Sequence, residues 1–327
     1  MKFVVTGGAG FIGSHVALRL ASQGHDVVIY DNLSSGKLDN VEQIKTALAD
    51  GMGSLTFVQA DILEAEVLTG ALEGSSAVFH QAALASVPRS FAEPAASLRS
   101  NVEGTAQVLE CARAVGLGTV VMASSSSLYG DTPTLPKHEG MPLRPMSPYA
   151  LSKAVDEQLL EMWTATYGMR TAGLRYFNIF GPRQDPDSEY SAVIPKFITR
   201  MLAGQAPTIY GDGMQSRDFT FVDNAVAANL LAAGLDPETG EMSGSSDEPR
   251  FVAVNIGICE RYTLLDLLAE LNDILGTDIE PSFEPGRIGD VRDSQASIDA
   301  AREQLGYEPR VSFRQGLERT VEWFAAQ

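Results

Sequence analysis

Short apolar runs alternate, along the first half of the chain, with segments whose apolar positions recur at helical spacing. The runs predict strands at 2–6, 26–31, 55–60, 77–80, 118–123 and 171–176. The periodic segments predict helices near 12–22, 38–50, 63–73, 97–115 and 148–167. This alternation predicts a parallel sheet whose strands are joined by crossover helices.

The pattern changes near residue 178. Turn-forming residues fill the stretch from Phe180 to Asp187, so we expect the chain to leave the sheet there. A helix over 222–235 and a strand over 251–256 then predict a return to the sheet. The expected fold is α/β: a doubly wound Rossmann domain of residues 1–177 plus about 218–257, and a smaller α/β substrate domain of 178–217 plus 258–327. The polar segment 236–250 predicts a mobile surface loop.

A glycine-rich turn joins the first predicted strand to the first helix. Gly7 permits the tight turn, Gly10 lets the backbone approach a pyrophosphate, and Gly13 lets the helix pack closely. Phosphates would contact the free amides of the helix N-terminus. Asp31 ends the second strand, where a carboxylate binds the adenosine ribose and repels a 2′-phosphate. The turn predicts NAD binding, and the alternative is a structural glycine turn in another α/β protein.

Tyr149 and Lys153 lie four residues apart in a segment that begins with Ser147 and Pro148, a capping residue followed by a residue suited to the first helical turn. Both side chains would therefore lie on one face of a helix. A tyrosine hydroxyl titrates near pH 10, and its use as a base near neutrality requires about 4 kcal/mol of phenolate stabilisation. The lysine ammonium and the helix N-terminus act in that direction. The pair predicts oxidation of a hydroxyl-bearing carbon.

Composition limits the class of protein. The chain has 327 residues, 44% of them hydrophobic, and a formal net charge of -18. This charge argues against nucleic acid or an anionic membrane as a partner. Cys111 and Cys259 are too few for a disulfide framework or a metal cluster, so we expect small core residues, no metal and a cytoplasmic protein. No apolar run is long enough to predict a membrane span.

Several motifs together resemble one family. They are the turn Thr6–Gly13, the run Ser124-Ser125-Ser126-Ser127-Leu128-Tyr129-Gly130, Tyr149 with Lys153, and Leu174-Arg175-Tyr176-Phe177-Asn178. The chain resembles the extended short-chain dehydrogenase/reductases over its whole length. Within them it resembles the nucleotide-sugar 4-epimerases, and most of all the bacterial branch that acts on UDP-N-acetylglucosamine. The closer resemblance depends on 85–90, 183–186, 192–196, 211–219 and 289–295.

The resemblance implies a reaction in which resident NAD is reduced and reoxidised within one turnover. Tyr149 would take the proton of the sugar 4-hydroxyl as hydride leaves C4. The 4-keto sugar would rotate, and hydride would return to its opposite face. Ser125 would share the hydroxyl proton, and the neighbouring Ser124 and Ser126 could contact cofactor or sugar. Lys153 would hold the nicotinamide ribose.

The resemblance also implies binding residues. Those for the cofactor are Gly7, Gly10, Phe11, Ile12, Gly13, Asp31, Asn32, Ser35, Gly36, Asp61, Ile62, Gln81, Ala82, Ala83, Asn101, Ser124, Tyr149, Lys153 and Tyr176. Those for a UDP-sugar are Ser86, Ser125, Ser126, Tyr149, Asn178, Ala192, Val193, Tyr210, Arg217, Arg287, Asp290 and Ser294. Arginines suit the diphosphate because their fork matches phosphate oxygens. His80 is expected to be a packed core residue, and Asn101 to be structural or to support the cofactor.

Ser294 matches a position that sizes the sugar pocket in this family, and serine leaves room for a 2-acetamido group. UDP-glucose could also bind. Arg89, Arg292 or Lys196 could instead favour a uronic acid, which leaves a UDP-glucuronate 4-epimerase as the main alternative.

A 4,6-dehydratase would need an Asp-Glu pair where Ser126 and Ser127 stand. A non-catalytic NAD-binding protein is a further alternative, and family resemblance implies a homodimer through helices 97–115 and 148–167.

Overall fold

A computed structural model describes residues 1–48, 52–186, 193–243, 248–286 and 292–327. In these ranges, seven parallel strands form one sheet in the order β11-β6-β5-β4-β1-β2-β3. Their bounds are β1 Lys2–Thr6, β2 Asp26–Asp31, β3 Leu55–Gln59, β4 Ala77–His80, β5 Thr119–Ser125, β6 Arg170–Tyr176 and β11 Phe251–Ile256. The strand order reverses between β1 and β4, the point at which such sheets bind ligands beyond the carboxyl ends of their strands.

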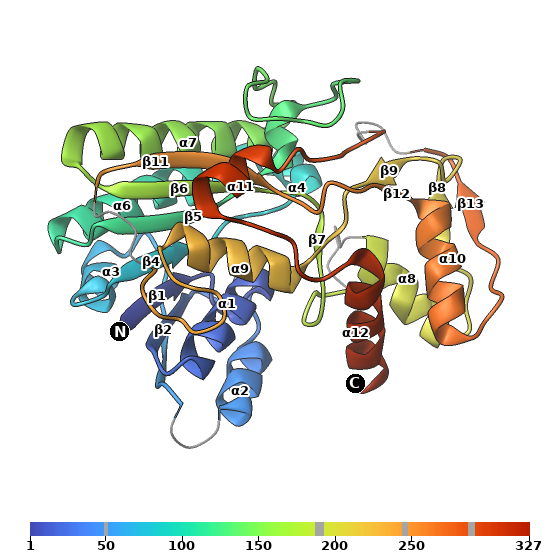
Figure 1. The fold of residues 1–327 in the computed structure, drawn as a ribbon, viewed down its shortest axis with the longest axis horizontal. Coiled ribbons are helices and arrows are strands. Elements are labelled where there is room, and N and C mark those ends of the chain that lie inside the picture. The colour runs from blue at the N-terminus through green and yellow to red at the C-terminus, as the bar shows by residue number, and fades with distance from the viewer. Residues whose placement is uncertain (49–51, 187–192, 244–247, 287–291) are drawn as a thin grey trace.

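Helices cover both faces of the sheet, which explains why its strands are apolar along their whole length (Figure 1). Phe3 and Val5 of β1 point into the core beneath α1 (Phe11–Ser22) and α9 (Val222–Ala232), while Val4 points to the opposite core. Helices α3 (Ala65–Leu72), α6 (Gly104–Ala114) and α7 (Pro148–Tyr167) cover that opposite face, and α2 (Leu38–Ala47) packs beside α1. The expected doubly wound fold is confirmed.

One predicted helix is interrupted. Residues 97–115 belong to the end of α5 (Pro94–Leu98), a π-helical turn (Arg99–Glu103) and α6, and α4 (Val87–Ala92) precedes them. The buried amide of Asn101 accepts from the backbone N–H of Leu84 at 2.8 Å and donates to the Ser152 hydroxyl at 2.9 Å. These tertiary bonds favour the local widening, which helical periodicity alone does not reveal.

The remaining elements gather beside one end of the sheet (Figure 1). They include α8 (Val193–Leu202), α10 (Leu264–Leu275) and α12 (Phe313–Ala325), and three two-stranded sheets. The sheets pair β7 (Ile179–Phe180) with β10 (Thr220–Phe221), β9 (Ser216–Arg217) with β12 (Tyr262–Thr263), and β8 (Thr208–Tyr210) with β13 (Ser282–Glu284). Helix α11 (Asp299–Leu305) packs against β11.

Two expectations need correction. Cys111 is buried, but Cys259 is exposed, because it lies in a turn after β11 with a φ of 62°. The first part of the predicted loop 236–250 is tied to the sheet domain: Arg19 and Gln23 donate to the Pro237 carbonyl, and His25 bonds to the carbonyl of Gly240. Polarity indicated a surface segment, but it did not reveal these backbone acceptors.

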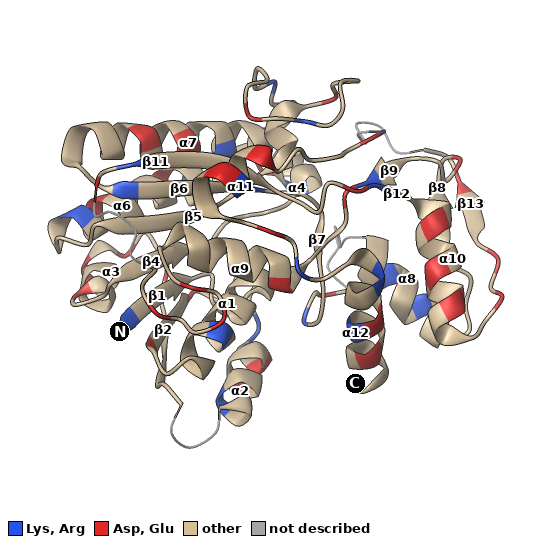
Figure 2. Ribbon diagram, viewed as in Figure 1, with Lys and Arg blue, Asp and Glu red and all other residues tan. Residues whose placement is uncertain are grey.

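Acidic side chains occur on helices of both parts of the molecule, α7 and α10 among them (Figure 2). Within the described residues, no helix is both long and apolar enough to cross a membrane.

Candidate active site

The glycine turn lies where the strand order reverses, and its geometry depends on glycine at two positions. Gly7 has a φ of 67°, and a Cβ there would lie 2.6 Å from the backbone nitrogen of Ala82. A Cβ on Gly13 would lie 2.2 Å from the carbonyl oxygen of Gly7. Gly10 is the N-cap of α1 and supplies no side-chain cap. The amides of Phe11 and Ile12 are therefore open to an anion, which fits a pyrophosphate.

Asp31 is held at the end of β2 by backbone donors. Its two oxygens accept from Ala9 at 3.0 Å and from Leu33 at 2.8 Å, and burial raises the pKa of its carboxyl. Gly36 lies against this carboxylate. Accepting groups held in this way suit a ribose diol.

The residues predicted to surround the adenosine come together beside Asp31. Asn32 donates to the Asp61 carboxylate at 2.7 Å, and Ile62 is buried next in sequence. Ser35 is exposed. Their cofactor contacts stay predictions.

Helix α7 carries Tyr149 and Lys153. Ser147 caps the helix by accepting from the Ala150 N–H at 3.1 Å, and Pro148 occupies its first turn, as predicted. Tyr149 is partly exposed, whereas Lys153 is 1% exposed. The helix packs against β5 and the 3-10 turn Ser126–Tyr129 that follows it. The helix that carries Tyr149 and Lys153 is therefore adjacent to the serine run at the carboxyl end of β5.

The serines of this run point in different directions. Ser125 ends β5, and its hydroxyl lies 2.8 Å from that of Ser127. Ser124 is buried and donates to Glu157 at 2.6 Å. Its hydroxyl is thus engaged inside the protein, and the catalytic role predicted for Ser125 stays a prediction. Ser126 begins the 3-10 turn.

Glu157 belongs to a buried network that sequence reasoning missed. Arg175 of β6 donates to Glu157 at 2.7 Å and to the Tyr129 hydroxyl at 2.8 Å. Tyr129 donates in turn to Asn255 at 2.6 Å, and burial raises the tyrosine pKa to about 12. The network joins α7 to the ends of β5, β6 and β11. The polar positions of the predicted helix did not indicate it.

Gln81 and Tyr176 meet at the carboxyl ends of β4 and β6. Tyr176 donates to the side-chain amide oxygen of Gln81 at 3.2 Å, and Asn229 of α9 donates to the Tyr176 hydroxyl at 2.7 Å. Gln81 closes the ring by donating to Asn229 at 2.9 Å. Burial raises the pKa of Tyr176 to about 12, so its hydroxyl stays protonated. Ala82 and Ala83 follow Gln81 and are half-buried.

Several described residues predicted to bind the substrate lie outside the seven-stranded sheet and its covering helices. Arg217 donates to the carbonyls of Ser216 and Arg292, and Ser294 is buried beside them through its backbone bond to Ser216. Elsewhere, Asn178 has a φ of 38°, Tyr210 ends β8, Val193 begins α8 and Ser86 caps α4. Ala192, Arg287 and Asp290 lie outside the described residues.

Asp218 fixes the segment next to Ser294. Its carboxylate accepts from the backbone N–H groups of Ile258, Cys259 and Ala296 at 3.0, 3.1 and 3.1 Å. The side chain is fully buried, and this burial raises its pKa to about 6. One carboxylate thus ties the turn after β11 to the segment that follows Ser294.

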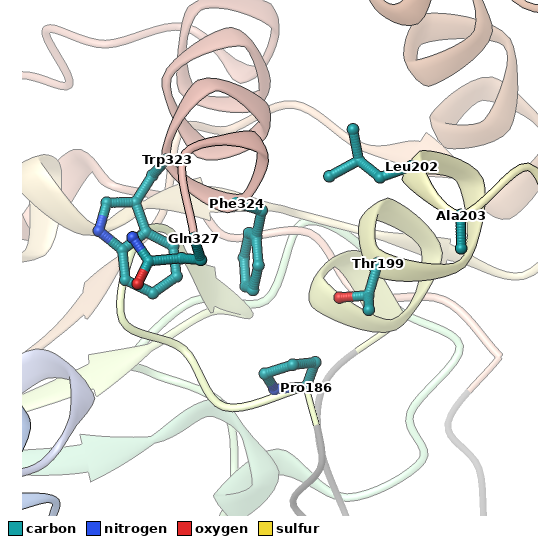
Figure 3. Close-up of a pocket in the computed structure, with 7 residues that line it drawn as sticks. All are labelled: Pro186, Thr199, Leu202, Ala203, Trp323, Phe324 and Gln327. Atoms are coloured by element: carbon teal, nitrogen blue, oxygen red, sulfur yellow. The ribbon is translucent and has the colours of Figure 1, made fainter.

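A separate hollow of about 500 Å³ lies between α8 and α12 (Figure 3). Its lining includes Leu202, Trp323 and Phe324, and none of its lining residues is among those predicted to bind cofactor or substrate. We assign it no role in the site.

Comparison with known proteins agrees with the geometry. Residues 3–242 match the NAD dependent epimerase/dehydratase family. UDP-glucose 4-epimerase of Mycolicibacterium smegmatis is 39% identical over 99% of this chain and 98% of its own. UDP-N-acetylglucosamine 4-epimerase of Methanobrevibacter ruminantium, solved with UDP-N-acetylmuramic acid, is 38% identical, with a TM-score of 0.89 over 100% of this chain and 98% of that one.

A third similar structure is a variant of UDP-glucuronic acid 4-epimerase from Bacillus cereus, solved with a fluorinated UDP-glucuronic acid and NAD. It is 29% identical, with a TM-score of 0.84 over 99% of this chain and 98% of that one. NAD, which is bound in that structure, fits the glycine turn and Asp31 described above. The chain belongs to the NAD-dependent epimerase/dehydratase family of nucleotide-sugar enzymes.

Proposed function

We propose that the protein interconverts UDP-N-acetylglucosamine and UDP-N-acetylgalactosamine at C4, and that it also accepts UDP-glucose and UDP-galactose. The observation that carries this proposal is Tyr149 and Lys153 on α7 beside a serine run that contains no carboxylate. Elimination of water would need an acid and a base where Ser126 and Ser127 stand. The site therefore has the groups for proton transfer at one hydroxyl and lacks those for dehydration.

NAD supplies the chemistry of taking a hydride from C4 and returning it. The chain's residues handle the proton: Tyr149 removes it from the 4-hydroxyl and gives it back to the other face, while Ser125 hydrogen-bonds the same oxygen. Lys153 holds the cofactor ribose and stabilises the phenolate by its charge. Arg217 and Arg287 bind the diphosphate, so the sugar can turn while its nucleotide stays fixed.

The choice of sugar depends on Ser294 and on the charges that face the substrate. Serine at this buried position leaves room for a 2-acetamido group. Two arginines that could have favoured a uronate are already paired: Arg89 with Glu93 at 3.1 Å and Arg292 with Asp212 at 3.1 Å. These pairs support a neutral sugar over UDP-glucuronate.

The same proposal assigns a ligand to each domain and includes an oligomeric state. Residues 1–177 plus about 218–257 hold NAD, and the remainder holds the UDP-sugar in a cytoplasmic enzyme. The outer face of α7 exposes Leu151 and Met162, and Leu98 of α5 is also exposed. Apolar side chains at helical spacing on neighbouring helices suit a homodimer.

Proton NMR of the purified protein with UDP-N-acetylglucosamine, UDP-glucose and UDP-glucuronate, in separate samples, tests the proposal. The anomeric signals of UDP-N-acetylgalactosamine should appear, and those of UDP-galactose more slowly. Conversion of the glucuronate alone would replace the proposal with a uronate epimerase. Inactivity on all three, with NAD added, would refute it.

A further inference from the structure

The ammonium of Lys153 has a carboxylate partner inside α7. Its Nζ lies 3.2 Å from Oδ2 of Asp156, three residues further along the helix. The lysine side chain is 2% exposed and that of Asp156 is 0% exposed. Water therefore screens the pair little, and each charge depends on the other for its stability.

Asp156 has few other partners. Its Oδ1 has no hydrogen-bond partner among the described residues. Burial raises the pKa of the carboxyl, while Lys153 and the nearby Thr105 hydroxyl act to lower it. The Thr105 hydroxyl lies 3.0 Å from Nε2 of His80, and Nδ1 of His80 lies 2.7 Å from the Thr6 hydroxyl. This line of polar groups ends at Thr6, the residue next to Gly7.

The neighbouring titratable groups do not substitute for the pair. Glu157 is bonded to Arg175 of β6, so its charge is balanced within α7 and β6. Burial and the charge of Lys153 lower the pKa of His80 to about 3, so its ring is neutral near pH 7. Asp156 is consequently the carboxylate that balances the lysine.

We propose that Asp156 is a positioning residue that keeps Lys153 charged and directed toward the cofactor ribose and the Tyr149 hydroxyl. This inference rests on the proposed function. An ammonium has three N–H donors, and Asp156 takes one, which leaves two for ribose hydroxyl groups. Without its counter-ion, an ammonium buried this deeply gives up its proton at lower pH. Tyr149 then loses the positive charge that stabilises its phenolate.

The variant Asp156→Asn tests the role with little change in shape. We expect the alkaline limb of the kcat pH profile to move down by about one unit, so that kcat at pH values on that limb falls by up to about tenfold. KM for the UDP-sugar should stay within about twofold, since Asp156 does not contact the sugar. Asp156→Glu, which keeps the charge, should recover part of the lost rate at high pH. Glu161→Gln removes an exposed charge from the same helix and should leave the profile unchanged.

An Asp156→Asn enzyme that melts at a lower temperature but keeps the wild-type pH profile would overturn the proposal. Calorimetric titration of NAD into cofactor-free protein adds a readout that needs no turnover. Affinity should fall several-fold in Asp156→Asn, and increasingly so as the pH rises. If the wild type converts none of the three sugars, the proposed function fails while this titration still tests the pair. Equal NAD affinity of both proteins at every pH would refute the positioning role.

Discussion

Gly10 and Gly13 differ in what an added methyl group would meet, and this difference predicts distinct effects of two alanine substitutions. A Cβ on Gly13 would lie 2.2 Å from the Gly7 oxygen, whereas a Cβ on Gly10 would lie 3.1 Å from it. Ordinary contact begins at 3.4 Å. Backbone atoms cannot swing aside, so Gly13→Ala has to displace α1 by roughly 1 Å, and Gly10→Ala by only a few tenths of an ångström.

Gly13→Ala should therefore lower the free energy of unfolding of the cofactor-free protein by about 2–3 kcal/mol. Gly10→Ala should lower it by at most about 1 kcal/mol, the usual difference between glycine and alanine at a helix N-cap. NAD affinity should behave differently. The methyl group of Gly10→Ala stands where the pyrophosphate approaches, and we expect its affinity to fall by about tenfold or more.

Urea unfolding of cofactor-free protein and calorimetric titration of NAD measure the two quantities separately. Gly70→Ala is the matched control, because Gly70 lies inside α3 with open space around its Cβ. It should raise the unfolding free energy by up to about 1 kcal/mol. Equal unfolding energies for the Gly10 and Gly13 variants would refute the packing argument. Wild-type NAD affinity in Gly10→Ala would refute the placement of the pyrophosphate.

Four further outcomes follow from the site and the surface. Tyr149→Phe should lower turnover, measured by NMR, by about a hundredfold to ten-thousandfold while NAD stays bound; a loss of a fewfold would exclude this phenol as the base. Ser294→Tyr should lower kcat/KM for UDP-N-acetylglucosamine more than for UDP-glucose, and equal losses would contradict the sizing role. Burial raises the pKa of Asp218 to about 6 in the folded protein. Protonation of Asp218 therefore contributes its full stabilisation of the fold below about pH 4, and this contribution is lost as the pH rises through 6. Urea unfolding at about pH 5 and pH 7 should show a fall in wild-type stability, of the order of 1 kcal/mol, that Asp218→Asn lacks; parallel curves would argue against it. Leu151→Glu and Met162→Glu should each yield a monomer in analytical ultracentrifugation, and an unchanged mass would remove α7 from the interface.

The strands could be predicted because burial on both sheet faces makes them apolar along their length. Val4 and Val5 illustrate this, since they lie in opposite cores. The site's frame could also be predicted, because Gly7, Ser147 and Pro148 act through local backbone geometry. The π-helical turn at Asn101 could not be predicted, because tertiary hydrogen bonds favour it.

The buried charged residues are the main part of the site that the sequence did not predict. Asp156 and Glu157 follow Lys153 in a helix whose pattern also fits a solvated polar face. Only the packing of α7 on β5 and β6 reveals that both carboxylates are buried and where Arg175 meets one of them. Asn229 was missed for the same reason, since its partners lie on two distant strands.

The hydrogen bonds that Asp218 accepts affect how the segment around Ser294 can change in evolution. Three of its bonds go to backbone N–H groups, at 258, 259 and 296, and a backbone donor is the same whichever side chain its residue carries. Mutations at those positions can alter the pocket wall without removing the bonds that hold it in place. In the proposed sugar pocket, single substitutions can therefore reshape the wall while the backbone scaffold around Ser294 stays in place.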